Sequence, residues 1–387
     1  MDKKVKLFFV INSLGRGGAE GIVLNLAKNL DKNKFAVTIV YFVNKKITAN
    51  HDIDSLPGVQ LKPILVEKIL SWSTFFSLLN YFKKVKPDIL HCHLPVSVIL
   101  GVIAGKLAGV KKIIVHEHNT YNFYSFKIRA CLKILRPLVD LSICYSESVQ
   151  KEIFDRINVL DDVPKSLKFG DCTIHNGIDE DTIFSQVSSI DKSVERNALG
   201  LKSDDLVVIS VSRLLDWKGQ DILIKAFESV VKKIPSAKLL IVGRGEKEGD
   251  LKKLSSQLGL EKNIIFLGER QDIVRLLAVS DIFSFVLKYP PNFSSEAIGV
   301  SALEAMAAGL PIILAKYPSI PDFMVDQQNV LLVDPNNDEA LSRAIISLAV
   351  DQDLRNKLKN GSRHIVQEHY SLHRIIRIYE YIYLNIL

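Results

Sequence analysis

Short apolar runs alternate with longer helix-like segments along most of this 387-residue chain. In the first half, runs that predict buried strands lie at 5–12, 35–43, 88–93, 111–118 and 141–146. They are apolar almost throughout, rather than on every second residue. Strands of this kind are typical of a parallel sheet that helices cover on both faces. The first half therefore predicts a doubly wound α/β domain.

The same alternation begins again after residue 200, with strand-like runs at 205–212, 237–243 and 263–268. We expect two doubly wound, Rossmann-like domains, 1–172 and 173–368. A final apolar-aromatic helix within 369–387 is expected to pack back toward the first domain. Ligands of doubly wound sheets bind beyond the carboxyl ends of the strands. Two domains with facing strand ends therefore predict a deep cleft between them.

Charge separates the two halves of the chain. Residues 1–175 have a net charge of +10 and the remainder −3. A basic domain suits an anionic partner such as nucleic acid, an anionic membrane face or a phosphorylated substrate. The sequence has no nucleic-acid-binding motif, so we expect no nucleic acid. It also has no secretory signal pattern and no apolar run of about 18 residues, which predicts a cytoplasmic protein.

The cysteines and histidines favour neither a disulfide framework nor a metal site. Cys92, Cys131, Cys144 and Cys172 form no C-x-x-C pair and predict reduced thiols. His91-Cys92-His93 puts two histidines on one face of a strand, but no second ligand pair follows in the sequence. Ordinary packing is the favoured interpretation, and we expect no metal and no cofactor.

A glycine-rich loop, SLGRGGAEG, follows the first strand and carries Gly15, Gly17 and Gly21. Such a loop suggests the phosphate cradle of a nicotinamide enzyme, which also needs an acidic residue at the end of the second strand. That strand ends YFVNKK, without an acid, although the lysines leave NADP open as an alternative. The favoured interpretation is that the loop forms one side of a sugar-nucleotide cleft.

The stretch SSEAIGVSALEAMAAGLP, at 294–311, predicts a phosphate site. Its helix begins near 299–302, and the free N–H groups of a first helical turn suit a phosphate. Glu304, one turn further on, can accept hydrogen bonds from the two hydroxyls of a ribose. An amphipathic helix with solvated glutamates is the alternative.

Two further motifs place polar groups beside strand ends. In VSRLLDWKGQD, Arg213 and Lys218 follow a strand and can clamp a diphosphate. In HEHN, His116 and His118 share one face of their strand because alternate residues do so. A solvated loop and ordinary loop hydrogen bonds are the respective alternatives.

Six motifs in order carry a family resemblance: GGAE, HNGID, SRLxxWKG, LLIVGRGE, IIFLGERQD and E-x7-E ending in EAMAAGLP. Together they resemble the retaining glycosyltransferases of family 4, which have the GT-B fold. The resemblance implies transfer of a hexose or N-acetylhexosamine from a nucleotide-sugar, with UDP-sugar favoured. The implied acceptor is a lipid-linked or polysaccharide glycan of lipopolysaccharide, capsule or exopolysaccharide synthesis. It also implies a metal-independent, front-face mechanism.

The resemblance also assigns roles to individual residues. Glu304 would hold the ribose hydroxyls, Glu296 would lie near the donor sugar, and Arg213 and Lys218 would meet the diphosphate. His118 would face the sugar, with His116 as the second candidate. The remaining implied donor-binding positions are Gly17, Gly18, Asn176, Gly268, Arg270, Gly299, Val300 and Ser301. The sequence departs from the family pattern at Ile298, where an aromatic residue is usual.

The segment 120–140 interleaves aromatic and basic residues, which suits an anionic membrane face or a lipid-diphosphate-linked acceptor. They are Tyr121, Phe123, Tyr124, Phe126, Lys127, Arg129, Lys133 and Arg136. A core-packed helix with solvated cations is an equal alternative. A GT-B sugar-nucleotide epimerase and a non-catalytic binding subunit stay open as alternative functions.

Overall fold

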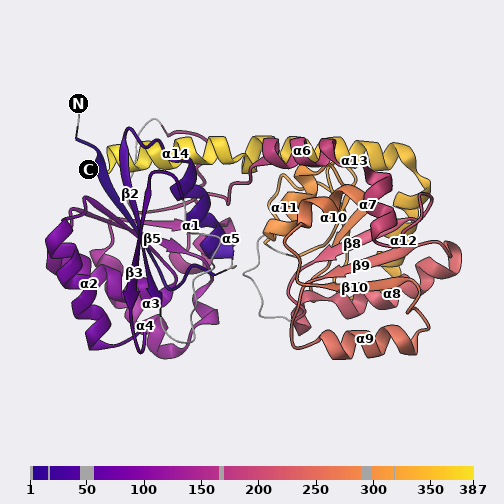
Figure 1. The fold of residues 1–387 in the computed structure, drawn as a ribbon, viewed down its shortest axis with the longest axis horizontal. Coiled ribbons are helices and arrows are strands. Elements are labelled where there is room, and N and C mark those ends of the chain that lie inside the picture. The colour runs from indigo at the N-terminus through magenta and orange to yellow at the C-terminus, as the bar shows by residue number, and fades with distance from the viewer. Residues whose placement is uncertain (1–2, 16–17, 44–55, 165–169, 289–297, 318) are drawn as a thin grey trace. The chain divides into compact units, whose positions relative to one another are not determined.

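The computed structural model describes residues 3–15, 18–43, 56–164, 170–288, 298–317 and 319–387. The chain divides into two compact units (Figure 1). Unit 1 comprises Met1–Gly177 together with Leu372–Leu387, and unit 2 comprises Ile178–Ser371.

Unit 1 is built on a seven-stranded parallel sheet in the order β3-β2-β1-β4-β5-β6-β7. Its strands are β1 Val5–Ile11, β2 Phe35–Val43, β3 Val59–Leu65, β4 Ile89–His93, β5 Lys112–Glu117, β6 Leu141–Cys144 and β7 Gly170–Thr173. Its helices are α1 Gly18–Asn29, α2 Trp72–Val85, α3 Pro95–Ala108, α4 Phe126–Leu135, α5 Glu147–Phe154 and α14 Leu372–Asn385.

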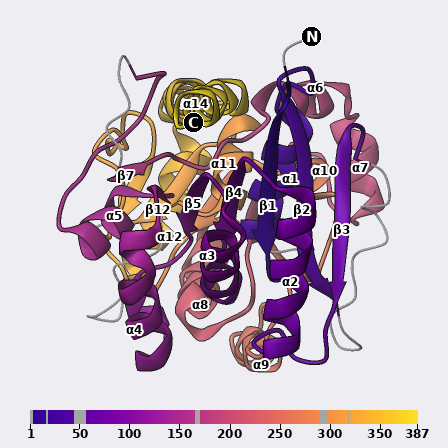
Figure 2. The ribbon, with the colours of Figure 1, turned by 90° about the vertical axis from the view of Figure 1, so that its left-hand side faces the viewer.

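Alternate residues of β1 pack on opposite faces of this sheet. Leu7 and Phe9 pack with α1 and α14, whereas Phe8 and Val10 pack with α2, α3 and α4. Figure 2 shows α14 on the opposite side of the sheet from α2, α3 and α4. Both faces are thus buried, which explains why the strand sequences are apolar throughout.

Unit 2 has a six-stranded parallel sheet in the order β10-β9-β8-β11-β12-β13. Its strands are β8 Val207–Val211, β9 Lys238–Val242, β10 Ile264–Gly268, β11 Ile282–Phe285, β12 Ile312–Ala315 and β13 Leu331–Val333. Its helices are α6 Glu180–Ser189, α7 Lys192–Ala198, α8 Gln220–Lys233, α9 Glu248–Gln257, α10 Ile273–Val279, α11 Val300–Ala307, α12 Asp338–Val350 and α13 Gln352–Ile365.

Helix α14 ends the chain, yet it belongs to unit 1 (yellow in Figure 1). Ile375, Tyr379, Ile382 and Tyr383 lie on one helical face and are buried against the sheet. On its other side, Glu380 accepts a hydrogen bond from the Asp31 backbone at 2.8 Å. Among the described residues, no helix is both long enough and apolar enough to cross a membrane.

The predicted fold class, two doubly wound parallel sheets, is confirmed, and the predicted strand 35–43 matches β2 at both ends. Strand β3 was not predicted. It is an edge strand that contains Pro63, and its residues are mostly half-exposed or exposed. A proline is tolerated at a sheet edge, but it weakens the sequence signal for a strand.

Candidate active site

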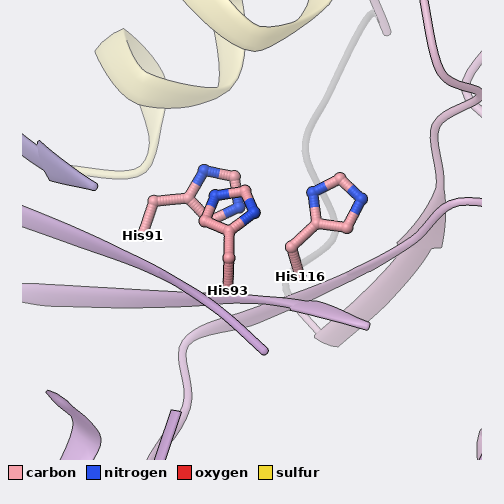
Figure 3. A group of neighbouring side chains, drawn as sticks. All are labelled: His91, His93 and His116. Atoms are coloured by element: carbon pink, nitrogen blue, oxygen red, sulfur yellow. The ribbon is translucent and has the colours of Figure 1, made fainter. Parts of the chain in front are cut away.

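Three histidines lie on one face of the unit 1 sheet, where β4 and β5 end. His91 and His93 are two residues apart on β4, and the register of the parallel pair sets His93 beside His116 of β5. Figure 3 shows the three rings standing together above the strands. All three side chains are buried. We call them, together with His118, the histidine layer.

Hydrogen bonds tie the histidine layer to its surroundings. His91 Nδ1 lies 2.8 Å from the hydroxyl of Tyr383, and His93 Nδ1 lies 2.9 Å from His118 Nε2. The hydroxyl of Tyr379 lies 3.5 Å from His116 Nδ1. Helix α14 therefore covers the layer and supplies two of its polar contacts.

His118 is the member of the layer that reaches the surface. It follows the last residue of β5 and is partly exposed, whereas His116 is 1% exposed. The two rings are stacked, with centroids 4.4 Å apart and an interplanar angle of 7°. Burial lowers the pKa of His118 to about 3, so this imidazole is neutral at physiological pH. A neutral, partly exposed ring can donate or accept one hydrogen bond to a ligand.

Glu117 lies between these two histidines in the sequence and contacts a different group of residues. The hydroxyl of Tyr121 donates to Glu117 Oε1 at 3.5 Å, and Arg136 donates in turn to Tyr121 at 3.4 Å. Burial raises the pKa of Glu117 to about 7. Tyr121 packs in the core beneath α2, α3 and α4, on the other face of the sheet from α14.

The glycine-rich loop of unit 1 is described only in part. Gly17 lies outside the described residues, while Gly18 is exposed and opens α1. A Cβ added at Gly18 would meet no described atom within 4 Å. The loop is anchored by Asn12, whose Oδ1 accepts hydrogen bonds from the backbone N and Oγ of Ser97 at 3.0 and 2.6 Å.

No motif in the sequence marks Asn12 or Ser97. They are 85 positions apart, and only the pairing of β1 with β4 brings them together. Asn176, from the HNGID turn, lies beside a small cavity with His175, Asn25 and Tyr379. Among the described residues, its buried Oδ1 has no hydrogen-bond partner.

In unit 2, the N-terminus of α11 is held between the ends of two strands. Ser301 Oγ donates to the carbonyl of Val211, at the end of β8, at 2.8 Å. Gly299 is the N-cap residue, and no described side chain caps the helix there. A Cβ on Gly299 would lie 2.8 Å from Cζ of Phe285, the last residue of β11. The first N–H groups of α11 thus have no cap from a described side chain, and the Ser301 hydrogen bond fixes the start of the helix to β8.

Arg213 and Lys218 lie in the turn after β8, close to the N-terminus of α11. Gln220 Nε2 donates to Ser212 Oγ at 2.7 Å and to the carbonyl of Arg213 at 3.2 Å. Lys218 Nζ lies 4.1 Å from the ring centroid of Trp217 and 5.2 Å from that of Phe285. Phe285 therefore contacts both the lysine and the start of α11.

Gly219 allows this turn to pack against β11. It has φ of +70°, and a Cβ there would collide with the backbone carbonyl of Val286. Other residues rarely adopt this conformation, and here they would also lack the space. The Lys218–Gly219 step therefore brings the cation to the end of the sheet.

Glu304 is one turn inside α11. Burial raises the pKa of its carboxyl to about 7. Glu296, the other glutamate of E-x7-E, lies outside the described residues. Ile298, which stands where the family usually has an aromatic residue, is 5% exposed and packs in the unit 2 core.

The predicted base-binding positions lie at the end of β10. The carbonyl of Gly268 accepts a hydrogen bond from the Gly243 backbone at 2.8 Å. The Arg270 guanidinium donates to both carboxylate oxygens of Asp272, at 2.8 and 2.6 Å. This pairing orients the guanidinium along its own loop.

Two family models match the chain in succession. The model for glycosyltransferase family 4 matches residues 16–182, and the model for glycosyl transferases group 1 matches residues 191–365. The chain belongs to the family 4 glycosyltransferases. The resemblance in the six motifs is thereby confirmed, and the protein is a glycosyltransferase with the GT-B fold.

Individual relatives cover most of this family 4 chain. An uncharacterised glycosyltransferase of Methanocaldococcus jannaschii is 25% identical over 373 residues, 91% of this chain and 90% of the relative. The UDP-Gal:alpha-D-GlcNAc-diphosphoundecaprenol alpha-1,3-galactosyltransferase of Escherichia coli is 27% identical over 312 residues, 76% of this chain and 77% of the relative.

Solved structures give the same fold. HepE of Anabaena, in complex with UDP and glucose, superposes with a TM-score of 0.80 at 21% identity, covering 98% of this chain and all of HepE. At this identity the likeness establishes the fold alone.

Proposed function

We propose that this glycosyltransferase is a retaining enzyme that moves a hexose or N-acetylhexosamine from a UDP-sugar to a lipid-linked or polysaccharide acceptor of surface-glycan synthesis. The observation that carries the proposal is the N-terminus of α11, which no described side chain caps, with Lys218 beside it and Glu304 one turn further on. The proposed domains follow the two compact units, with unit 2 binding the donor and unit 1 binding the acceptor.

The donor diphosphate binds at the start of α11 in this proposal. The backbone N–H groups of Val300 and Ser301 and the positive end of the helix dipole favour an anion there. Arg213 and Lys218 add charge-assisted hydrogen bonds. These groups also stabilise the nucleoside diphosphate that leaves, and transfer therefore needs no metal ion at the diphosphate.

The rest of the nucleotide follows the strand ends of unit 2. Glu304 accepts hydrogen bonds from the two ribose hydroxyls, and the base lies at Gly268 and Arg270. Glu296 and the Gly17–Gly18 step complete the donor-sugar contacts. The UDP in HepE and the UDP-galactose named for the E. coli relative support uracil as the base.

Unit 1 supplies His118 to the transferred sugar. His116 has almost no surface with which to touch a ligand, and the partly exposed His118 is therefore the favoured residue. Glu117, the carboxylate between His116 and His118 in the sequence, packs with Tyr121 and is not offered as a nucleophile in this proposal. A front-face transfer, in which the leaving phosphate deprotonates the acceptor, fits a site that contributes placement and charge stabilisation.

Unit 1, the proposed acceptor-binding unit, is proposed to contact an anionic membrane face through α4. Phe126 and Ile134 on this helix are 76% and 75% exposed. Lys127 and Lys133 are exposed beside them, while Tyr121 packs into the core. Exposed apolar and basic residues on one short helix suit the headgroup region. The lipid-diphosphate acceptor named for the E. coli relative supports the same location.

A thermal-shift screen against UDP, GDP, ADP, CMP, NAD and NADP tests the donor assignment first. A ligand of the native state raises the melting temperature by mass action. We expect a shift with UDP that Glu304→Ala abolishes. A shift with NADP alone that is indifferent to Glu304→Ala would contradict the assignment.

A transfer assay then tests the reaction. The chain is incubated with UDP-glucose, UDP-galactose or UDP-N-acetylglucosamine and a polyprenyl-diphosphate sugar, and the new anomeric linkage is determined by NMR. An α-linked product from an α-linked donor supports retention. A β-linked product contradicts retention, and an epimerised sugar nucleotide in place of a glycoside contradicts transfer.

A further inference from the structure

The histidine layer contains a group of ring nitrogens with no assigned use in glycosyl transfer. His91, His93 and His116 each offer one nitrogen, and these three atoms lie within 4.8 Å of one another. The ring centroids are 4.3 Å apart for His91 and His93, and 5.1 Å apart for His93 and His116. Figure 3 shows His116 turning a ring nitrogen toward the other two rings.

The hydrogen bonding of these rings is incomplete. Nε2 of His91, His93 and His116 is buried, and among the described residues none of the three atoms has a hydrogen-bond partner. A buried polar atom without a partner is costly and calls for an explanation, such as an ion or a trapped water. The three atoms belong to rings that lie together, and one common explanation is therefore more economical than three separate ones.

On His91 and His93, one nitrogen has the hydrogen bond that a metal-binding histidine needs at its second nitrogen. A histidine that binds a metal through one nitrogen almost always has a hydrogen bond at the other, which fixes the ring. Here Tyr383 contacts Nδ1 of His91, and His118 contacts Nδ1 of His93. The third contact, from Tyr379 to His116, is at the hydrogen-bond limit of 3.5 Å, so either nitrogen of His116 is available to an ion.

We propose that His91, His93 and His116 form a buried site for a divalent transition metal, with zinc the best-suited ion. Three neutral imidazoles suit zinc, cobalt and nickel, and they suit calcium or magnesium poorly because those ions prefer oxygen ligands.

The geometry requires only local adjustment. Zinc–nitrogen bonds of about 2.0–2.1 Å in a tetrahedral site set the ligand nitrogens roughly 3.4 Å apart. The offered nitrogens lie within 4.8 Å of one another, and a bound ion would draw them to this spacing by rotating the rings. Three protein ligands leave a fourth position for a solvent molecule.

The ion would act on structure and not on the donor diphosphate, whose proposed ligands are all in unit 2. It would join β4 to β5 and fix His93, which in turn holds His118. This proposal departs from the expectation of ordinary packing at His91 and His93. The sequence spacing did not reveal the third ligand, because His116 comes from the next strand.

Metal analysis of the full chain tests the proposal. The protein is produced with a tag that contains no histidine, dialysed against a weak chelator, and analysed by mass spectrometry for zinc. We expect one equivalent per chain, and replacement by cobalt should give the intense visible absorption of a four-coordinate ion. No bound equivalent, after loading with zinc or cobalt, would overturn the proposal.

Variants locate the ion. His93→Phe and His116→Phe keep an aromatic ring in the layer and remove a ligand, and each should lose the bound equivalent. His364→Asn, at an exposed histidine, should keep it. Retention of the metal in both phenylalanine variants would contradict the site. If these variants do not fold, anomalous diffraction from wild-type crystals at the zinc edge decides: a peak among the three rings supports the site, and a peak elsewhere or none refutes it.

Discussion

His93 Nδ1 lies 2.9 Å from His118 Nε2. The fully buried imidazole of His93 therefore holds the partly exposed imidazole of His118 through Nε2. Both rings are neutral because burial lowers their pKa values. One ring must therefore donate and the other accept, and this choice also sets the role of the remaining nitrogen of each ring. His118 consequently has Nδ1 left for a ligand, and the hydrogen bond from His93 fixes the orientation of its ring.

Replacing His118 should reduce glycosyl transfer without affecting nucleotide binding. We expect His118→Ala to lower kcat by about 10²–10³-fold, because it removes one preorganised polar group from the transferred sugar. The Kd for UDP should be unchanged, since the proposed nucleotide ligands are in unit 2. Transfer kinetics and calorimetric UDP titration measure the two quantities.

The exposed histidine His364 supplies the control for this experiment, and His364→Ala should retain wild-type kcat. His93→Phe should lower kcat by about tenfold, because it removes the contact that orients His118. A His118→Ala enzyme with wild-type kcat would show that the ring does not meet the sugar.

Arg213 and Lys218 should each contribute to binding of the diphosphate and not of the nucleoside. A hydrogen bond to a charged group contributes about 1.5–3 kcal/mol, and Arg213→Ala or Lys218→Ala should therefore weaken UDP about 10- to 100-fold. Uridine should bind to both variants as it does to the wild type. Calorimetric titration with UDP and with uridine separates the two effects.

A matched cation distinguishes this effect from a general loss of charge. Lys252, on α9, is exposed and pairs with Glu248. Lys252→Ala should leave the Kd for UDP unchanged. An equal loss of UDP affinity in this variant would mean that net charge, and not the proposed clamp, attracts the nucleotide.

The histidine layer shows why the site was only partly predictable from the sequence. Alternation along a strand correctly placed His116 and His118 on one face. The register of β4 against β5, which adds His91 and His93, is fixed by three-dimensional pairing. Tyr383 is 292 positions from His91, so no local pattern links them. The same holds for Phe285, which contacts both Lys218 and Gly299 from a strand between them.

The fold was easier to predict from the sequence than the site, because each buried strand of a parallel sheet is marked by its own apolar run. The predicted strands that became β1, β2, β4 and β5 fit this rule. Strand β7, Gly170–Thr173, is short and contains Asp171, a buried carboxylate paired with Arg156. A local apolar pattern does not identify such a strand, because its burial depends on the partners of Asp171 as well as on the apolar Cys172.

Glu304→Gln should stabilise the ligand-free protein more at pH 8 than at pH 5. Burial raises the folded-state pKa of Glu304 from 4.5 to about 7. The folded chain therefore keeps a proton that the unfolded chain has lost, and stability falls as pH rises from about 4.5 to about 7. Glutamine avoids this loss, and we expect a gain of roughly 3–8 °C in Tm at pH 8.

Thermal unfolding of both proteins across this pH range measures the difference. The exposed Glu261, on which burial has little effect, serves as control, and Glu261→Gln should give no such pH-dependent gain. A Tm difference between Glu304→Gln and wild type that does not change with pH would contradict the buried-carboxyl assignment. The same variant should lose the UDP-induced shift, since an amide oxygen accepts less strongly from the ribose than a carboxylate.

Helix α4 should determine binding to anionic membranes. Replacing both exposed apolar residues, Phe126→Ser with Ile134→Ser, removes the side chains that would enter the headgroup region. We expect at least about a tenfold loss of binding to vesicles that contain an anionic lipid, because each buried apolar side chain contributes about 1.5–3 kcal/mol. Co-sedimentation with vesicles measures it.

The control removes an equally exposed apolar residue elsewhere. Val350, at the end of α12 in unit 2, is 74% exposed, and Val350→Ser should not alter vesicle binding. Wild-type protein that stays in solution with anionic vesicles at low salt would contradict the membrane contact and leave core packing as the role of 120–140.

Gly299→Ala and Gly249→Ala should change stability in opposite directions. At Gly299 a Cβ would lie 2.8 Å from Cζ of Phe285, a buried ring at the end of β11, and overpacking of this kind costs about 1–3 kcal/mol. At Gly249, inside α9, a Cβ meets no described atom within 4 Å, and alanine should stabilise the helix by about 0.5–1 kcal/mol.

Because Gly299 also caps α11, its alanine variant should lose UDP affinity, whereas Gly249→Ala should keep it. Chemical unfolding and UDP titration of both variants provide the test. A Gly299→Ala protein of unchanged stability and unchanged UDP affinity would mean that the start of α11 does not meet the diphosphate.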